Sequence, residues 1–141
     1  MTPCKVVFID DCPKGQLYMK RLIKRFEGKA DLTLHDNGKE GLLWLKRQID
    51  LPALVFVNLT LPDMSGINLI QEVKALPRFK VVPFVMISDL SDPELLLKGY
   101  EVGAVSHAIS PYTKLGALGW GKEYKFALHY WLSRNPVKLC S

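Results

Sequence analysis

The sequence predicts an α/β domain in which a parallel sheet lies between two layers of helices. Five short apolar stretches alternate with five stretches whose apolar residues recur at helical spacing. The strand-like stretches are apolar throughout, which is typical of strands buried on both faces. With 141 residues, 48% of them hydrophobic, the chain has the size of one domain. We therefore expect a single domain over residues 1–141, with a core over about 4–133 and a short C-terminal tail over 134–141.

The first part of the chain predicts two strand–helix pairs. Residues 4–9 are a continuous apolar strand, and residues 14–27 carry apolar side chains at helical spacing. A short second strand is expected over 31–35. Asn37 and Glu40 have the spacing of a capping box, so a second helix is expected from there to about Gln48.

The rest of the chain predicts three further pairs. They are expected in this order: a strand over 53–57, a helix from about Ser65 to Leu76 closed by Pro77, a strand over 82–87, a helix marked by Ser91 and Glu94 that ends near Val102, a strand over 105–109, and a last helix after Pro111 that ends near Ser133. Three glycines interrupt the start of the last helix, so the stretch 114–122 is expected to be loose or bent.

Polar residues stand where two of these strands end. Asp10 and Asp11 follow the first strand, and Asn58 follows the third, ahead of the motif Pro62-Asp63-Met64-Ser65-Gly66. This pattern resembles the receiver domain of bacterial response regulators over essentially the whole chain. The resemblance implies a doubly wound, flavodoxin-like sheet in the order 2-1-3-4-5, a (βα)5 three-layer sandwich. In such a sheet a ligand crevice lies beyond the carboxyl ends of strands one and three.

The resemblance also implies a role for each position of the pocket. In order these are an acidic pair for Mg²⁺ at Asp10 and Asp11, the phosphoacceptor position at Asn58, the phosphoryl-binding hydroxyl at Ser88, the lysine position at Ser110, and the switch aromatic at His107. Asp89 stands where receivers carry a small residue, so it is expected to occlude the pocket. The alternative for the acidic pair is that it only caps the next helix.

These departures predict a pocket without phosphoryl chemistry. The amide of Asn58 is a poor nucleophile and cannot form an acyl phosphate. Ser110 cannot neutralise phosphoryl charge as a lysine would. We therefore expect no catalytic residue, no enzymatic activity and no cofactor, with Mg²⁺ binding through Asp10 and Asp11 weak or absent. A small enzyme or flavin carrier is disfavoured, because the loop after strand one is acidic where a flavin phosphate needs donors.

Charge is unevenly distributed along the chain. The net charge is +5, and basic residues concentrate in the segments 14–29 and 113–141. If the resemblance holds, the first and last helices share one face and form a continuous basic surface. This surface is either an ordinary solvated face or a docking site for an acidic partner. An electrostatic binder of nucleic acid or of an acidic surface is the alternative function, although no DNA-reading motif is present.

The expected function is that of a stand-alone receiver-like signalling protein in a two-component or phosphorelay pathway. It would act as a phosphorylation-independent interaction module. The expected partner is a histidine kinase or another response regulator, and a homodimer through helix four, strand five and helix five is a further expected arrangement. No apolar run approaches the length of a membrane span, so we expect no membrane partner and a cytoplasmic location. The three cysteines, Cys4, Cys12 and Cys140, are an odd number without metal-ligand spacing, so we expect them to be reduced. Nucleic acid is not the expected partner.

Overall fold

The chain forms one five-stranded parallel sheet. The computed structural model describes residues 3–26, 28–89, 92–110 and 122–134. The strands are β1 (Cys4–Ile9), β2 (Ala30–His35), β3 (Leu54–Asn58), β4 (Phe84–Ser88) and β5 (Ser106–Ile109). They pair in the order β2-β1-β3-β4-β5. The predicted order 2-1-3-4-5 is confirmed, and the direction of the chain across the sheet reverses between β1 and β3.

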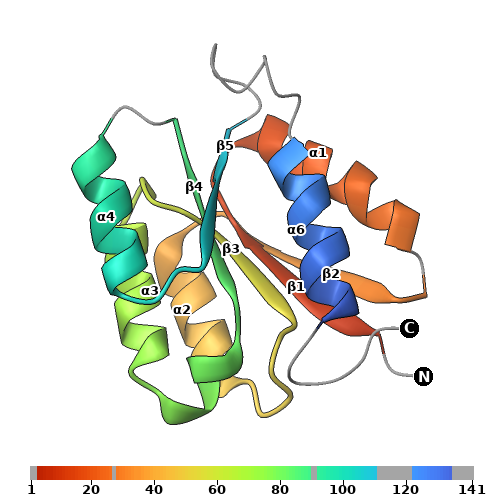
Figure 1. The fold of residues 1–141 in the computed structure, drawn as a ribbon, viewed down its shortest axis with the longest axis horizontal. Helices are drawn as coiled ribbons and strands as arrows, with labels where there is room; N and C mark the ends of the chain where they lie inside the picture. The colour runs from red at the N-terminus through yellow and green to blue at the C-terminus, as the bar shows by residue number, and fades with distance from the viewer. Residues whose placement is uncertain (1–2, 27, 90–91, 111–121, 135–141) are drawn as a thin grey trace.

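Helices cover the two faces of the sheet unequally (Figure 1). On one face lie α2 (Gly38–Arg47), α3 (Gly66–Lys74) and α4 (Pro93–Glu101); on the other lie α1 (Pro13–Ile23) and α6 (Lys122–Ser133). Two 3-10 helices, η1 (Lys24–Phe26) and η2 (Pro77–Val81), follow α1 and α3. None of the helices in the described ranges is long and apolar enough to cross a membrane.

A separate hydrophobic core fills each side of the sheet. On the α1–α6 side, Phe8 and Phe56 pack against Tyr124, with ring centroids 6.3 and 5.6 Å from that of the tyrosine. On the other side, Ile9 and Val57 pack against α2 and α3. Because successive residues of a strand point to opposite faces, both sets of strand side chains are buried. This explains why the strands read as continuous apolar runs.

The predicted elements agree with the observed ones, with two local differences. All five strands lie within two residues of their predicted bounds. The first helix ends at Ile23 and continues as the 3-10 helix η1. Asn37 caps α2 as predicted, since its side chain accepts a hydrogen bond from the backbone N–H of Glu40. The prediction of Ser91 as the cap of α4 was wrong, because the carboxylate of Asp92 accepts the N–H groups of the first turn.

The cysteines also differ from expectation. Cys4 is disulfide-bonded, so the expectation of three reduced cysteines was wrong, whereas Cys12 carries a free thiol. The predicted loose stretch 114–122 lies outside the described residues apart from Lys122. Of the predicted C-terminal tail, only Arg134 is described.

Candidate functional site

The strand-end residues converge on one pocket. The pairing register places Asn58 opposite Ile87 and Ser88 opposite Ile109, so β3, β4 and β5 end at the same edge of the sheet. A pocket of about 230 Å³ opens there. Its lining residues come from the ends of these three strands and the loops after them, and they are Asn58, Thr60, Ile87, Ser88, Asp89 and Ser110. The edge is the one at which ligands bind in open α/β sheets.

Asn58 is held by two hydrogen bonds that fix its orientation. Its Nδ2 donates to Oδ1 of Asp10 over 2.9 Å, and its Oδ1 accepts the backbone N–H of Thr60 over 2.8 Å. Turning the amide over would set its oxygen against a carboxylate and its NH₂ against an N–H group. Only one orientation therefore satisfies both neighbours. Both polar atoms of the Asn58 side chain are committed within the protein.

Asp10 is the buried charge of the site. Its side chain is only 3% exposed. Burial raises the pKa of its carboxyl above the ordinary value, while the hydrogen bonds from Asn58 and from the backbone N–H of Cys12 act in the opposite direction. The same oxygen, Oδ1, accepts both of these bonds. Asp10 is thus tied to β3 by Asn58 rather than open to a ligand.

Asp11 is separated from this arrangement. It is exposed and does not line the pocket, although it adjoins Asp10 in the chain. Its charge also acts to raise the pKa of Asp10. The structure therefore brings Asp10 and Asn58 together but leaves Asp11 facing solvent.

The opposite wall of the pocket contains hydroxyl groups and a carboxylate. Ser88 and Ser110 lie side by side, because the backbone N–H of Ser110 donates to the carbonyl of Ser88 over 3.0 Å. Asp89 is exposed at the rim. No lysine or arginine is found among the described residues that line the pocket. Asp89 stands at the rim of the pocket, and Asp10 lies behind Asn58.

The residues present do not fit a Mg²⁺ ion. Mg²⁺ requires oxygen ligands in near-octahedral geometry, usually including one or two carboxylates. Oδ1 of Asp10 already accepts two N–H groups, and the oxygen of Asn58 accepts a third. Within the described ranges no three His, Cys, Asp or Glu residues gather as a metal-binding group. An ion that took Oδ1 of Asp10 as a ligand would compete with the amide of Asn58 for that oxygen.

His107 lies away from the pocket, on β5. Its ring nitrogen Nδ1 is 3.3 Å from the hydroxyl of Tyr100 on α4, within hydrogen-bonding distance. It is partly exposed. The position assigned to the switch aromatic is thus engaged by α4 on the outer side of the sheet rather than by the pocket.

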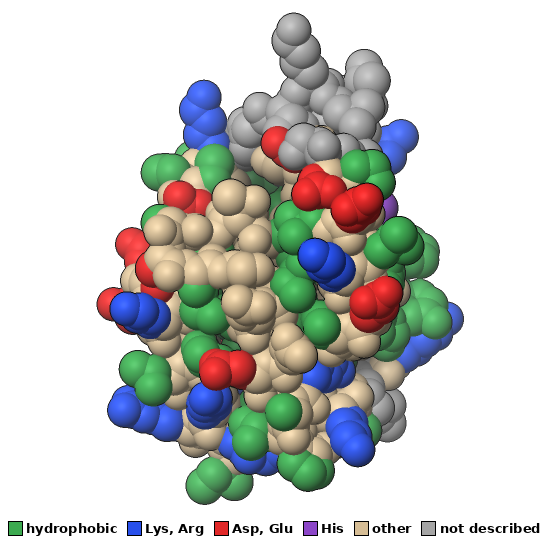
Figure 2. Space-filling model, turned by 90° about the vertical axis from the view of Figure 1, so that its left-hand side faces the viewer, with side chains coloured by type: hydrophobic (Ala, Val, Ile, Leu, Met, Phe, Trp, Pro, Cys, Tyr) green, Lys and Arg blue, Asp and Glu red, His purple; other side chains and the backbone are tan. Residues whose placement is uncertain are grey.

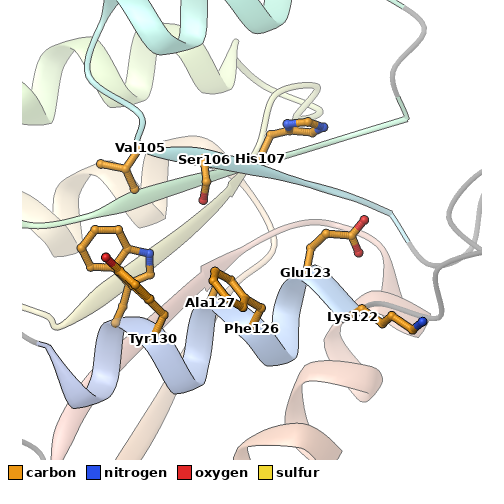
Figure 3. Close-up of a pocket in the computed structure, with 9 residues that line it drawn as sticks. Val105, Ser106, His107, Lys122, Glu123, Phe126, Ala127 and Tyr130 are labelled. Atoms are coloured by element: carbon orange, nitrogen blue, oxygen red, sulfur yellow. The ribbon is translucent and has the colours of Figure 1, made fainter.

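A wide groove runs between β5 and α6, and we call it the β5–α6 groove (Figure 3). It has a volume of about 560 Å³. Phe126 and Tyr130 project from α6 beside Val105 and Ser106 of the β5 side. Phe126 is 68% exposed, and its ring stacks on that of Tyr130 with centroids 5.6 Å apart. Phe126 and Tyr130 are therefore exposed on the last helix, whereas Tyr124 is buried.

The fold and the residues at the strand ends can now be compared with known proteins. The sequence profile described as the response regulator receiver domain matches residues 6–113. The chain belongs to the response regulator receiver family. Receiver domains work in two-component signalling and interact with histidine kinases or other signalling proteins.

Several proteins resemble this receiver in sequence or in fold. The chain is 25% identical over 109 residues to chemotaxis protein CheY1 of Helicobacter pylori, which covers 77% of the chain and 86% of CheY1. It is 26% identical over 112 residues to a probable cyclic di-GMP phosphodiesterase of Vibrio cholerae, covering 79% of the chain but 24% of that longer protein. The Mn²⁺-bound form of response regulator Rcp1 has the same fold, with a TM-score of 0.80 at 19% identity over 99% of the chain and 100% of Rcp1.

Sequence reasoning missed several groups that shape the receiver's pocket. The backbone N–H groups of Cys12 and Thr60 hold Asp10 and Asn58, and no side-chain pattern predicts such contacts. Burial raises the pKa of the Tyr124 hydroxyl on α6, and the nearby charge of Asp10 raises it further. Asp63 also escaped notice. Its carboxylate accepts the N–H groups of Gly38 and Lys39, at 2.7 and 2.9 Å, and so anchors the loop after β3 to the start of α2.

We expect Asp10→Asn to increase the stability of the receiver at neutral pH. Because the folded-state pKa of Asp10 lies above the unfolded-state value near 3.8, its protonated form stabilises the fold fully below that value. The stabilisation is lost as pH rises through the raised pKa. The variant should therefore gain melting temperature at pH 7 and gain less at pH 4. Thermal unfolding at both pH values, in buffer containing a chelator, measures the difference. A melting temperature that falls at pH 7, by as much as at pH 4 or by more, would contradict the assignment.

Proposed function

We propose that this receiver accepts no phosphoryl group and acts as a protein-interaction module whose pocket is held in one state. The observation that carries the proposal is the 2.9 Å hydrogen bond from Nδ2 of Asn58 to Asp10. This bond occupies Oδ1, one of the two carboxylate oxygens of Asp10 that could bind a metal ion, and its donor is the side chain that stands at the phosphoacceptor position. The neutral amide of Asn58 thus satisfies its polar neighbours in the pocket without a ligand.

The chemistry of the remaining pocket residues supports the same proposal. A carboxamide cannot become an acyl phosphate, because its oxygen is too weak a nucleophile. Developing charge on a phosphoryl group would meet Asp89 and the hydroxyl of Ser110, and no described cation lines the pocket. We therefore propose that the receiver has no enzymatic activity and requires no Mg²⁺ or other cofactor.

Treatment with acetyl phosphate and Mg²⁺ tests the loss of phosphoryl chemistry. We expect the intact mass of the protein to remain unchanged after incubation, because no carboxylate stands at position 58. A receiver known to accept phosphate from acetyl phosphate serves as the positive control. A mass increase that hydroxylamine removes would identify an acyl phosphate and overturn the proposal.

We propose that the partner binds through the β5–α6 groove. Aromatic side chains in a concave, partly apolar site are favoured anchors in protein interfaces. Phe126 and Tyr130 supply such anchors, and Arg134 lies over the Tyr130 ring with its guanidinium carbon 4.4 Å from the centroid. A histidine kinase or another response regulator is the proposed partner, and a second copy of the chain is the proposed partner in a homodimer.

A charge placed in the groove should abolish this binding. Proximity labelling by the chain in its own cells should mark a set of signalling proteins, or the chain itself, and Phe126→Glu should lose that set. Leu43→Glu is the matched control, because Leu43 is 53% exposed on α2, across the sheet from the groove. Loss of the same proteins in both variants, or in neither, would exclude the groove as the binding surface.

We propose that the receiver works in the cytoplasm, where the kinases of two-component pathways transfer their phosphoryl groups. The disulfide at Cys4 favours an oxidising compartment instead, because disulfides are rare in reducing compartments such as the cytoplasm. Fractionation of cells that express the tagged chain separates the two locations. Recovery in the cytosolic fraction with Cys4 reduced would support the proposal, and recovery in an oxidising compartment would refute it.

A further inference from the structure

A second groove lies at the opposite edge of the sheet, between α1 and β2, and we call it the α1–β2 groove. It has a volume of about 550 Å³, nearly that of the β5–α6 groove. Its apolar lining includes Leu17 of α1 and Leu32 and Leu34 of β2, and basic side chains, Lys20, Arg21 and Lys24, line it as well. Leu17 is 47% exposed. None of these residues belongs to the strand-end pocket.

The groove follows from the unequal helical layers. Three described helices cover one face of the sheet and two cover the other (Figure 1), and the edge strand β2 keeps partly exposed leucine side chains on the α1 side. Leu32 and Leu34 alternate along β2, point to the same face and remain partly exposed there. The space beside α1 is therefore where one more helix would complete the layer and bury these leucines.

The charged side chains among the described residues that line the groove are all basic. Neither α1 nor η1 contains an acidic residue, and their basic side chains at Lys20, Arg21 and Lys24 are exposed. Asp31 neighbours Leu32 on β2, so its side chain points to the other face of the sheet. By contrast, acidic and basic side chains mix over the face that carries α2, α3 and α4 (Figure 2). The α1–β2 groove thus combines an apolar interior with a border whose described charged side chains are basic.

We propose that the α1–β2 groove binds an acidic amphipathic helix of a partner protein. Apolar residues one helical turn apart would contact Leu17, Leu32 and Leu34, and flanking carboxylates would pair with the lysines and Arg21. In this mode of binding, the partner helix carries its apolar anchor residues at positions i, i+3, i+4 and i+7. Together with the β5–α6 groove, this second surface lets one receiver hold two proteins at opposite edges of its sheet.

The chemistry of the groove favours a peptide over the other anionic partners. Nucleic acid would satisfy the basic border but would leave the leucines uncovered, and none of the described residues that line the groove is an aromatic on which a base could stack. A membrane surface needs apolar side chains that protrude, whereas Leu32 and Leu34 are partly buried in a recess behind exposed α1 side chains. An amphipathic helix is convex and carries both required surfaces.

Fluorescence anisotropy with a labelled synthetic helix of leucine and glutamate, its leucines on one face, tests the proposal. We expect saturable binding to the whole chain, weakened roughly tenfold or more by Lys20→Glu/Lys24→Glu. Lys80→Glu/Lys98→Glu is the matched control, since both lysines are exposed on the other side of the molecule, and it should bind as the wild type does. Leu17→Ser, at an exposed site, should weaken binding without lowering the melting temperature.

The same assay separates the competing occupants. Scrambling the peptide, which keeps its composition and removes its apolar face, should abolish binding. Equal affinity for the scrambled peptide would show general charge attraction and overturn the proposal. So would equal weakening by the two double variants, no saturable binding, or binding only to duplex DNA or to phosphatidylserine vesicles. Sedimentation that shows a dimer lost in Lys20→Glu/Lys24→Glu would assign the groove to a second copy and also overturn it.

Discussion

Asn58→Asp is expected to lower the free energy of unfolding by about 2 kcal/mol at pH 7 without divalent cations. The change replaces the hydrogen bond from Nδ2 to Asp10 with two carboxylates in contact at a buried site. Like charges at this distance raise each other's pKa. The stability of the variant should therefore fall as pH rises through those raised pKa values and should recover in acid.

The same variant should gain a dependence on Mg²⁺ that we expect the wild type not to show. A third carboxylate beside Asp10 and Asp11 supplies the oxygen ligand that Asn58 withholds, and ligand binding to the folded state raises stability by mass action. Chemical unfolding with and without Mg²⁺ measures both effects. Asn58→Ala separates the lost hydrogen bond from the added charge, since it should be destabilised without responding to Mg²⁺. A wild type that Mg²⁺ stabilises as much as Asn58→Asp would contradict this account of the pocket.

Gly66→Ala is expected to destabilise the receiver by about 3 kcal/mol, because a methyl group at this position has no space. Gly66 begins α3 and donates its backbone N–H to the carbonyl of Leu59 over 3.0 Å. A Cβ here would overlap the carbonyl oxygen of Asn58 and lie 2.8 Å from Cα of Leu59. Both obstacles are backbone atoms, so relief requires moving the end of β3, which also displaces Asn58 from the pocket.

Gly38→Ala is the matched control at the start of another helix. A Cβ at Gly38 would meet the side chain of Met64, with its sulfur at 2.6 Å. Met64 is partly exposed and flexible, so it can move aside. Urea denaturation should therefore show a loss of about 1 kcal/mol for Gly38→Ala, clearly less than for Gly66→Ala. Equal losses in the two variants would contradict the assignment of the Gly66 effect to contact with the backbone of β3.

The pattern of the strands predicted a parallel sheet, and the order 2-1-3-4-5 followed from the resemblance to receiver domains. Of the residues assigned to the pocket, Asn58, Ser88, Asp89 and Ser110 line it, whereas Asp11 and His107 do not. Continuous apolar strands signalled a buried parallel sheet, and Asp10 and Asn58 stood at strand ends that a parallel sheet must bring to one edge. In the sequence, the motif from Pro62 to Gly66 served only as a mark of the family. The structure explains why two of its residues are needed. Asp63 caps α2, and Gly66 admits the backbone of β3.

The details that decide what the pocket does could not be predicted. Adjacent aspartates in the sequence suggest a pair, but the chain turns so that Asp10 is buried and Asp11 is exposed. The bond between Asn58 and Asp10 joins residues 48 positions apart, and its geometry depends on backbone N–H groups that carry no sequence signal. The α1–β2 groove could not be predicted either, because it depends on how much of the five-stranded sheet α1 and α6 cover.

An NMR titration of the ¹⁵N-labelled wild-type chain, first with Mg²⁺ and then with Mg²⁺ and beryllofluoride, tests the central claim most directly. If the hydrogen bond between Asn58 and Asp10 closes the pocket, the amide signals of Asp10, Asn58 and Ser88 will show no saturable shift with either addition. Saturable shifts at these residues that extend to His107 would show a pocket that still binds a metal and a phosphoryl mimic, and would contradict the account.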